Sequence, residues 1–247
     1  TCAGLRKDAP PELQHLGDKT GHIACDGHGA ERGSLYCALA WFFEHFAHDA
    51  LLREFPKPKA PINTPKKLPG FGGLGKDAEP SHLLRWLVVL VGDLHQPLHW
   101  LREKGYGADV KLVYKEQQYN LLQFWEEYLP AHLPPKPSPA QLEKEYDARS
   151  PDWHHRVPTE LFRDWAKETA EAVCNEVYAA MEVNHGDGSR SIPEPFKLEE
   201  EIFQRWLRLA QDLSTLAGER LGFVLTELIE HRRHKKDSKE GVCRHGG

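Results

Sequence analysis

Long apolar runs are missing from this sequence. No stretch approaches the roughly 20 apolar residues that cross a bilayer, and the opening TCAGLRKDAPPELQ lacks the apolar centre of a signal peptide. A large charge of one sign is also missing, because the formal net charge is −5 and the pI is about 6.3. We therefore expect a soluble chain with no membrane span, and any contact with nucleic acid would have to be local.

Cysteine is scarce as well. Five cysteines in 247 residues are too few for a disulfide scaffold, and the odd number leaves at least one unpaired or paired with another chain. Composition alone does not distinguish an oxidising from a reducing compartment. What the chain does have is 40% hydrophobic residues, which is enough to bury a full core in one large domain or two small ones.

Helical periodicity dominates the sequence. Apolar residues recur at helical spacing over residues 34–55, 119–129, 140–149, 159–183 and 198–236. Residues 79–100 read as a further helix, opened by Pro80 and apolar enough to lie centrally in the core. Only residues 109–118 alternate like a strand, which predicts one small hairpin. We predict an all-α, multi-helix domain over residues 1–236, followed by a flexible tail at 237–247.

Three potential metal ligands stand at the end of the apolar helix. The stretch GDLHQPLH contains Asp93, His95 and His99. Residues four apart share a helix face, yet the position four before Asp93 is Val89, which is no ligand. Pro97 breaks the helical register, so Asp93 and His99 can still converge through an irregular turn. The structural alternative is that Asp93 caps this segment and both histidines bind buried carbonyls.

The order of several segments resembles that of one enzyme family. GDLHQPLH is followed by KGYGADVKLVY, NLLQFWEEYL, DWAKETAEAVCNEVY and LAGERLGFVLTEL. This succession, from about residue 15 to residue 230, is similar to the S1/P1 nucleases. The resemblance implies an all-α fold shared with zinc-dependent phospholipase C, with three zinc ions in a cleft. It also implies cleavage of RNA and single-stranded DNA and removal of 3′-phosphates, in which zinc polarises phosphate oxygens and activates water.

The resemblance supplies only part of the ligand set. Asp93 matches the family's zinc-bridging aspartate, and His99 matches the last histidine of its motif. The family has histidines where this chain has Val89 and Leu122, and an aspartate where it has Glu126. Glu126 can still bind zinc, whereas the two apolar residues cannot.

The beginning of the chain departs further from the family. Family members open with an aromatic residue whose amine and carbonyl bind zinc, whereas this chain opens with Thr1. The stretch LQHLGD places His15 and Asp18 at the family's H-x-x-D, which provides a zinc ligand and a carboxylate that orients water. The family's opening helix has no counterpart here, so we expect another polypeptide, or residues 1–33, to cover that side.

Cysteine pairing and compartment also follow from the resemblance. It implies a disulfide from Cys174, in the family's A-x-x-C helix, to Cys25, with Cys37 as a competing partner. It favours the secretory pathway or an organelle lumen, although the sequence itself leaves the localisation unknown.

The remaining ligands are too few for three zinc ions, which need about nine protein ligands at three each. The surviving ligand candidates are Asp93, His99, Glu126, His15 and Asp18. We predict no zinc, or at most one weakly held ion near Asp93, His99 and Glu126. The favoured hypothesis is an inactive, degenerate domain kept for a structural or interaction role in a larger assembly. The alternative is an active zinc endonuclease and 3′-nucleotidase, and only then would single-stranded nucleic acid be a partner.

Two structural expectations accompany this hypothesis. Val89 and Leu122 should be buried and in contact beside Asp93, because apolar residues in place of ligands would turn a cleft floor into core. Asp93 should find new partners, either backbone N–H groups of the HQPLH turn or a neighbouring histidine, since an unpaired buried carboxylate is costly.

Overall fold

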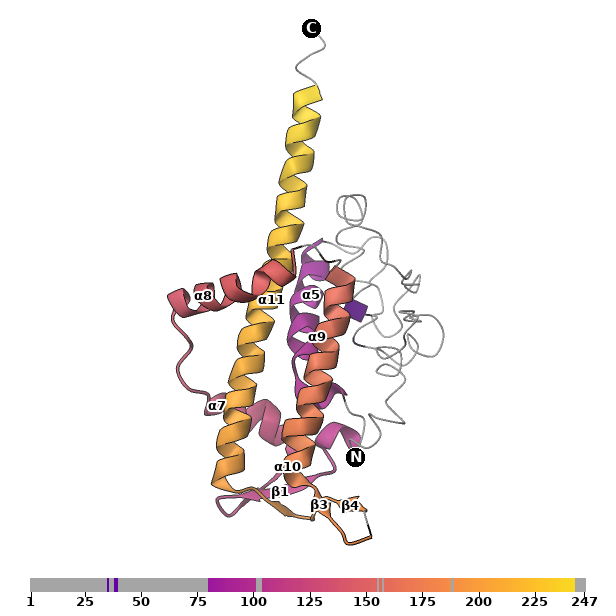
Figure 1. Ribbon diagram of the computed structural model, residues 1–247, viewed down its shortest axis with the longest axis vertical. Coiled ribbons are helices and arrows are strands. Elements are labelled where there is room, and N and C mark those ends of the chain that lie inside the picture. Colours follow the sequence, from indigo (N-terminus) through magenta and orange to yellow (C-terminus); the bar gives the residue numbers. More distant parts are fainter. Residues whose placement is uncertain are drawn as a thin grey trace.

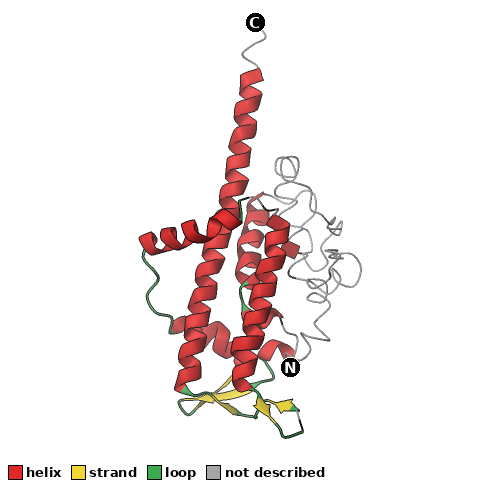
Figure 2. Ribbon diagram, in the orientation of Figure 1, coloured by secondary structure: helices red, strands yellow, loops and turns green. Residues whose placement is uncertain are grey.

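Three helices lie side by side and carry the fold (Figure 1). The computed structural model describes residues 35, 38–39, 80–100, 104–154, 156, 158–187 and 189–242. The three helices are α5 (Pro80–Leu94), α9 (Pro158–Ala172) and α11 (Glu200–Val242). Small strands lie at one end of this bundle (Figure 2). The predicted all-α class is confirmed, and the strands among the described residues lie at that end.

Helix α5 begins at Pro80, as predicted, and turns one apolar face into the core. Its inward residues are fully or almost fully buried at helical spacing: Leu87, Leu90, Val91 and Leu94. The helix ends at Leu94, and a 3₁₀ turn, η1 (Pro97–Trp100), follows. The indole N–H of Trp100 donates to the carbonyl of Leu94 over 2.9 Å. This hydrogen bond fastens the turn to the helix end that Pro97 cannot extend.

The predicted hairpin is also confirmed. Strand β1 (Lys111–Tyr114) pairs antiparallel with β2 (Gln117–Asn120). Two residues at the turn, Lys115 and Glu116, have φ of 47° and 67°, as a tight two-residue hairpin turn requires.

Further strands were not predicted. Strand β5 (Phe196–Lys197) adds parallel to β1, and β3 (Val183–Asn184) pairs antiparallel with β4 (Arg190–Ser191). Each of these strands has two residues, too few to show an alternating pattern in a sequence.

The helix after the hairpin contains a π-helical segment. Asn120 caps its start, because its side-chain oxygen accepts a hydrogen bond from the backbone N–H of Gln123 over 2.7 Å. The helix runs through α6 (Leu121–Gln123), π-helical η3 (Phe124–Tyr128) and α7 (Leu129–Ala131). A second such segment follows α9, with η5 (Val173–Tyr178) and α10 (Ala179–Met181). The interrupted stretches match the helices predicted at 119–129 and 159–183.

The core is aromatic and lies between these helices. Its large side chains with almost no exposure include Trp206, Tyr178, Phe124, Phe162 and Phe223. Helix α8 (Pro139–Arg149) and the short η4 (Ser150–Asp152) and η2 (Gly105–Gly107) are the remaining elements in the part of the chain that the structure describes. No residue of α8 is fully buried, and the helix crosses α11 on the outside of the bundle (Figure 1). It therefore contributes a surface rather than core.

Several predictions fall outside the described residues. His15, Asp18, Cys25 and Cys37 belong to this group. Cys174 is buried in η5. Because Cys25 lies outside the described residues, the pairing of these two cysteines stays a prediction. Within the predicted 34–55 helix, Leu35, Ala38 and Leu39 are helical, and the latter two are buried. Among the helices that the structure describes, none is long and apolar enough to span a membrane.

Candidate functional site

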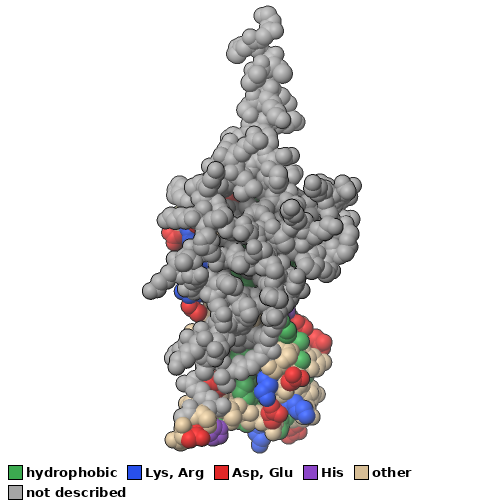
Figure 3. Space-filling model, turned by 90° about the vertical axis from the view of Figure 1, so that its right-hand side faces the viewer, with side chains coloured by type: hydrophobic (Ala, Val, Ile, Leu, Met, Phe, Trp, Pro, Cys, Tyr) green, Lys and Arg blue, Asp and Glu red, His purple; other side chains and the backbone are tan. Residues whose placement is uncertain are grey.

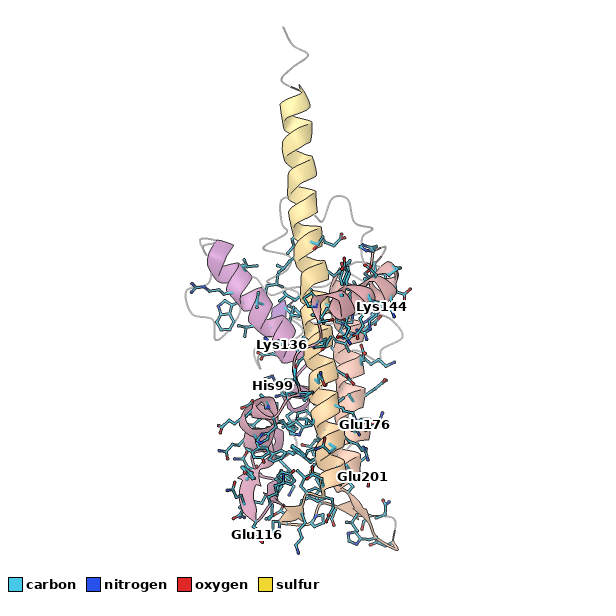
Figure 4. All side chains as sticks on the ribbon, turned by 90° about the vertical axis from the view of Figure 1, so that its left-hand side faces the viewer. His99, Glu116, Lys136, Lys144, Glu176 and Glu201 are labelled. Atoms are coloured by element: carbon cyan, nitrogen blue, oxygen red, sulfur yellow. The ribbon has the colours of Figure 1, made fainter. Side chains whose placement is uncertain are left out.

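Asp93, His99 and Glu126 come together as the sequence suggested. Nδ1 of His99 lies 3.6 Å from Oδ1 of Asp93, and Nε2 lies 3.5 Å from Oε1 of Glu126. Asp93 is in the last turn of α5, His99 in η1 and Glu126 in η3. Figure 4 shows where His99 lies on the molecule. Of the partners predicted for Asp93, a neighbouring histidine lies beside it, at a distance longer than a hydrogen bond.

This open cluster of Asp93, His99 and Glu126 is accessible to solvent. The three side chains are 39%, 31% and 45% exposed, respectively. Partial burial raises the pKa of the Asp93 carboxyl above its ordinary value; His99 opposes this shift, and the negative charge of Glu126 adds to it. The histidine thus lies between two acids, at distances longer than a hydrogen bond.

His95 lies four residues before His99 and has a different environment. It is buried, with Nδ1 2.7 Å from the carbonyl of Val91 and Nε2 2.9 Å from Nη1 of Arg220. Because a guanidinium can only donate, Nε2 accepts and Nδ1 donates. Burial lowers the pKa of His95 to about 4, the hydrogen bond to Val91 opposes this, and the charge of Arg220 lowers it further. The structural alternative is therefore right for His95, which binds a buried carbonyl.

The expectation that Val89 would be buried is wrong. Its side chain is 49% exposed, and Leu84 and Val88 are exposed on the same helix. Leu122 is partly buried and packs against the hydrophobic core. The two positions differ because α5 turns Val89 away from its inward face, whereas the start of α6 lies on the core. One of these two positions is therefore a core contact and the other is an exposed apolar side chain.

The open cluster fits the family's zinc centre poorly. A zinc ion takes ligand atoms at about 2.0–2.2 Å around a single point, but the two ring nitrogens of His99 face different carboxylates. One ion can use only one of those nitrogens, and the neighbouring position that would add a second histidine is Leu122. Over the described ranges, no group of three or more His, Cys, Asp or Glu side chains is arranged to hold a metal. The number of bound ions stays a prediction.

Sequence reasoning missed a buried ionic network. Arg220 of α11 donates to Glu168 of α9 as well as to His95, and its guanidinium lies 4.9 Å from the ring centroid of Trp165. We call these four residues the buried network. The available signal was an arginine on the inward face of α11, three and four residues before the buried Phe223 and Val224.

The visible surface does not resemble a nucleic-acid groove. On the face drawn in Figure 3, the described side chains that can be seen at the lower end mix acidic, basic and apolar types. This mixture agrees with the composition, which gives no strong basic field.

Comparison with known families identifies the domain. Residues 74–230 match the family S1/P1 Nuclease, and this range contains the open cluster and the buried network. No curated protein sequence matches the chain. Because the match covers more than half of the 247 residues, and the fold is helical as the resemblance implied, the chain belongs to the S1/P1 nuclease family.

Proposed function

We propose that this chain is a degenerate S1/P1 nuclease domain that lacks three-zinc phosphodiester hydrolysis and is kept for a structural or interaction role. The observation that carries the proposal is that apolar residues, Val89 and Leu122, stand at two positions where the resemblance implies histidine ligands. Neither can coordinate a metal, and Leu122 packs on the core instead. His99 lies between two carboxylates, and among the described residues no group of three or more His, Cys, Asp or Glu side chains is arranged to hold a metal.

The energetic argument concerns the metal ligands. Losing an outer-shell partner of a ligand already lowers metal affinity about 10- to 100-fold, and losing a coordinating nitrogen removes a metal bond outright. Zinc catalysis needs an ion that polarises phosphate oxygens and lowers the pKa of a bound water. Asp93, His99 and Glu126 alone do not supply this electrostatic stabilisation.

The exposed apolar side chains of α5 support the interaction role. Leu84, Val88 and Val89 are each more than a third exposed, and the same helix ends beside the open cluster. Exposed apolar surface of this kind is typical of an interface. We propose that a second polypeptide covers this side of α5, in the secretory pathway or an organelle lumen.

The test is metal content and nuclease activity of the purified chain. We expect at most one zinc per chain by elemental analysis, and no chelator-sensitive cleavage of RNA or single-stranded DNA. A triple variant, Val89→His, Leu122→His and Glu126→Asp, restores the family's ligand types at the three altered positions and should bind more zinc. Leu84→His adds a histidine at another exposed position of α5 and serves as the matched control.

The opposite result would favour the alternative. Two or more tightly bound zinc ions in the unaltered chain, together with chelator-sensitive cleavage, would identify an active zinc endonuclease and 3′-nucleotidase. A stable monomer in dilute native solution would contradict the proposed partner, whatever the metal content.

A further inference from the structure

The last turns of α11 continue past the bundle. In Figure 1 they are drawn in yellow and lie beyond the ends of α5, α8 and α9, and Figure 2 shows the same arrangement. Among the elements that the structure describes, none accompanies α11 over this stretch. We call residues 230–240, EHRRHKKDSKE, the extension. Packing against the bundle therefore does not account for the residue types in the extension.

The extension lacks the residues that several kinds of binding helix need. It contains no apolar residue and no Phe, Tyr or Trp. A helix that inserts into a lipid surface, or that pairs in a coiled coil, needs an apolar face. A protein that binds single-stranded nucleic acid stacks the bases on aromatic side chains. The extension is equipped for none of these three modes of binding.

Its cations fall on one face of the helix. Successive helical residues are about 100° apart, so positions i, i+3, i+4 and i+7 share a face. Four lysines and arginines occupy such a set, which we call the cationic stripe: Arg232, Lys235, Lys236 and Lys239. The acids Glu230 and Asp237 fall on the opposite face. The extension thus sorts its charges by face, in a chain whose net charge is −5.

Helix stability does not explain the stripe. Charged residues support a helix when an acid and a base stand three or four residues apart. Within the stripe only Lys236 has an acid at such a spacing, Glu240, whereas the stripe residues themselves are three or four apart. Like charges at this spacing destabilise a helix, so a bound anion would relieve the repulsion. Arg233, outside the stripe, has Glu230 three residues before it and Asp237 four residues after it.

The stripe suits a rigid polyanion. Its four cations span about 10 Å along the helix axis. A nucleic-acid duplex carries one negative charge per roughly 1.7 Å of its axis, and arginine binds phosphate oxygens in bidentate fashion. An anionic membrane also attracts basic segments, but stable attachment takes a second signal such as an inserted apolar face. Because the extension has no apolar residue, the duplex is favoured.

We propose that the cationic stripe binds the phosphate backbone of double-stranded nucleic acid without reading its base sequence. In Figure 4, His99 lies within the bundle and the extension lies beyond it, so this site is separate from the open cluster. The inference is independent of the proposed function, because backbone binding at the extension needs neither zinc nor hydrolysis.

The test measures binding to the full chain by fluorescence anisotropy, with a chelator present so that metal-dependent cleavage does not contribute. The probes are a short labelled DNA duplex, an RNA duplex of the same sequence, one DNA strand alone, and vesicles that contain phosphatidylserine. We expect saturable binding to a duplex, and a plot of log Kd against log salt with a slope of about 3 to 4, because about four phosphates are neutralised. The more tightly bound of the two duplexes identifies the source of the backbone.

Three outcomes would overturn the proposal. They are the absence of saturable binding to either duplex, tighter binding to the single strand than to the duplexes, and tighter binding to the vesicles. The last of these would identify a membrane surface as the partner.

Two neighbouring arginines test the location. Arg232→Gln removes a charge from the stripe, and Arg233→Gln, the matched control, removes the same charge from outside it. We expect Arg232→Gln to weaken duplex binding several-fold and to lower the salt slope by about 1, and Arg233→Gln to leave both nearly unchanged. Glutamine is about as good a helix former as arginine, so both variants should keep the thermal midpoint of the unaltered chain. Equal losses of binding in the two variants would mean that total charge, rather than the stripe, binds the duplex, and would refute the assignment.

Discussion

The buried network and the open cluster both include side chains from the same eight residues, but they differ in their exposure to solvent. In GDLHQPLH, His95 points inward and contacts Arg220 and the carbonyl of Val91. Asp93 and His99 lie at the surface, where His99 also contacts Glu126. Both clusters combine histidine with charged groups. Only the buried one has its histidine hydrogen-bonded on both ring nitrogens at 2.9 Å or less. Within the S1/P1 fold, this motif therefore holds a buried, hydrogen-bonded histidine and a solvent-accessible histidine four residues apart.

The difference shows how burial decides the value of a polar contact. In the open cluster, the contacts of His99 are 3.5–3.6 Å long, and solvent screens them, so each contributes little. In the buried network, removal of Arg220 leaves Nε2 of the buried His95 without a donor, which is costly, whereas the Glu168 side chain is 50% exposed and stays solvated.

The largest expected effect comes from removing the centre of the buried network. Arg220→Met should lower the free energy of unfolding by about 1–3 kcal/mol, because Nε2 of the buried His95 loses its hydrogen-bond donor. Urea denaturation measures the loss. The matched control is Arg205→Met, which breaks the exposed 2.9 Å pair with Glu176 and should cost less than about 1 kcal/mol. Similar losses for both variants would mean that the two ion pairs are equivalent.

A second prediction concerns the pH dependence of the buried histidine. The pKa of His95 falls from 6.5 to about 4 on folding, so between these values the unfolded chain binds a proton that the folded chain does not. The stability from His95 is complete above pH 6.5 and is lost as the pH falls toward 4, a change of about 3 kcal/mol. Urea midpoints measured across this range should fall with pH, and His95→Gln should flatten the fall. An unchanged slope in the variant would assign the titration to another group.

A smaller effect is expected in the open cluster. The pKa of Asp93 is raised in the folded state, so its ionised form disfavours folding once the pH exceeds the pKa of the unfolded chain. Asp93→Asn should then increase stability at pH 7 by less than about 1 kcal/mol, since solvent screens this partly exposed group. Denaturation at pH 7 gives the sign. A large destabilisation would show that Asp93 holds something, such as a metal ion, that the amide cannot.

The smallest expected effect is a change in the pKa of Asp93 without a change in folding. Glu126→Gln removes the negative charge that helps to raise the pKa of Asp93, so that pKa should move down. Carboxyl carbon shifts in an NMR titration report it, with Glu127→Gln, the next acid on η3, as the control. If both variants move the pKa of Asp93 equally, the charge of Glu126 has no greater effect on that pKa than the charge of Glu127.

The sequence predicts the fold where local signals are strong. Pro80 marks the start of α5, and the alternation in residues 109–118 marks the hairpin, because both depend on neighbouring residues alone. Sequence spacing cannot separate His95 from His99, since the partner of His95 is Arg220, 125 residues away. The exposure of Val89 was mispredicted for a similar reason. Its burial depends on which face of α5 meets the bundle, and the motif alone does not contain that information.

The π-helical segment η3 allows the position of Glu126 in the open cluster to change by insertion or deletion of one residue. Its backbone N–H at Leu129 bonds to the carbonyl of Phe124, five residues earlier, so the turn holds one residue more than an α-helical turn. Deleting Glu127 would return this turn to α-helical spacing, while Leu121 and Leu129 on either side keep their faces toward the core. Only the residues between them would change register, Glu126 included. The distance from Glu126 to His99 can therefore evolve by single-residue insertion or deletion, without a matching change elsewhere in the bundle.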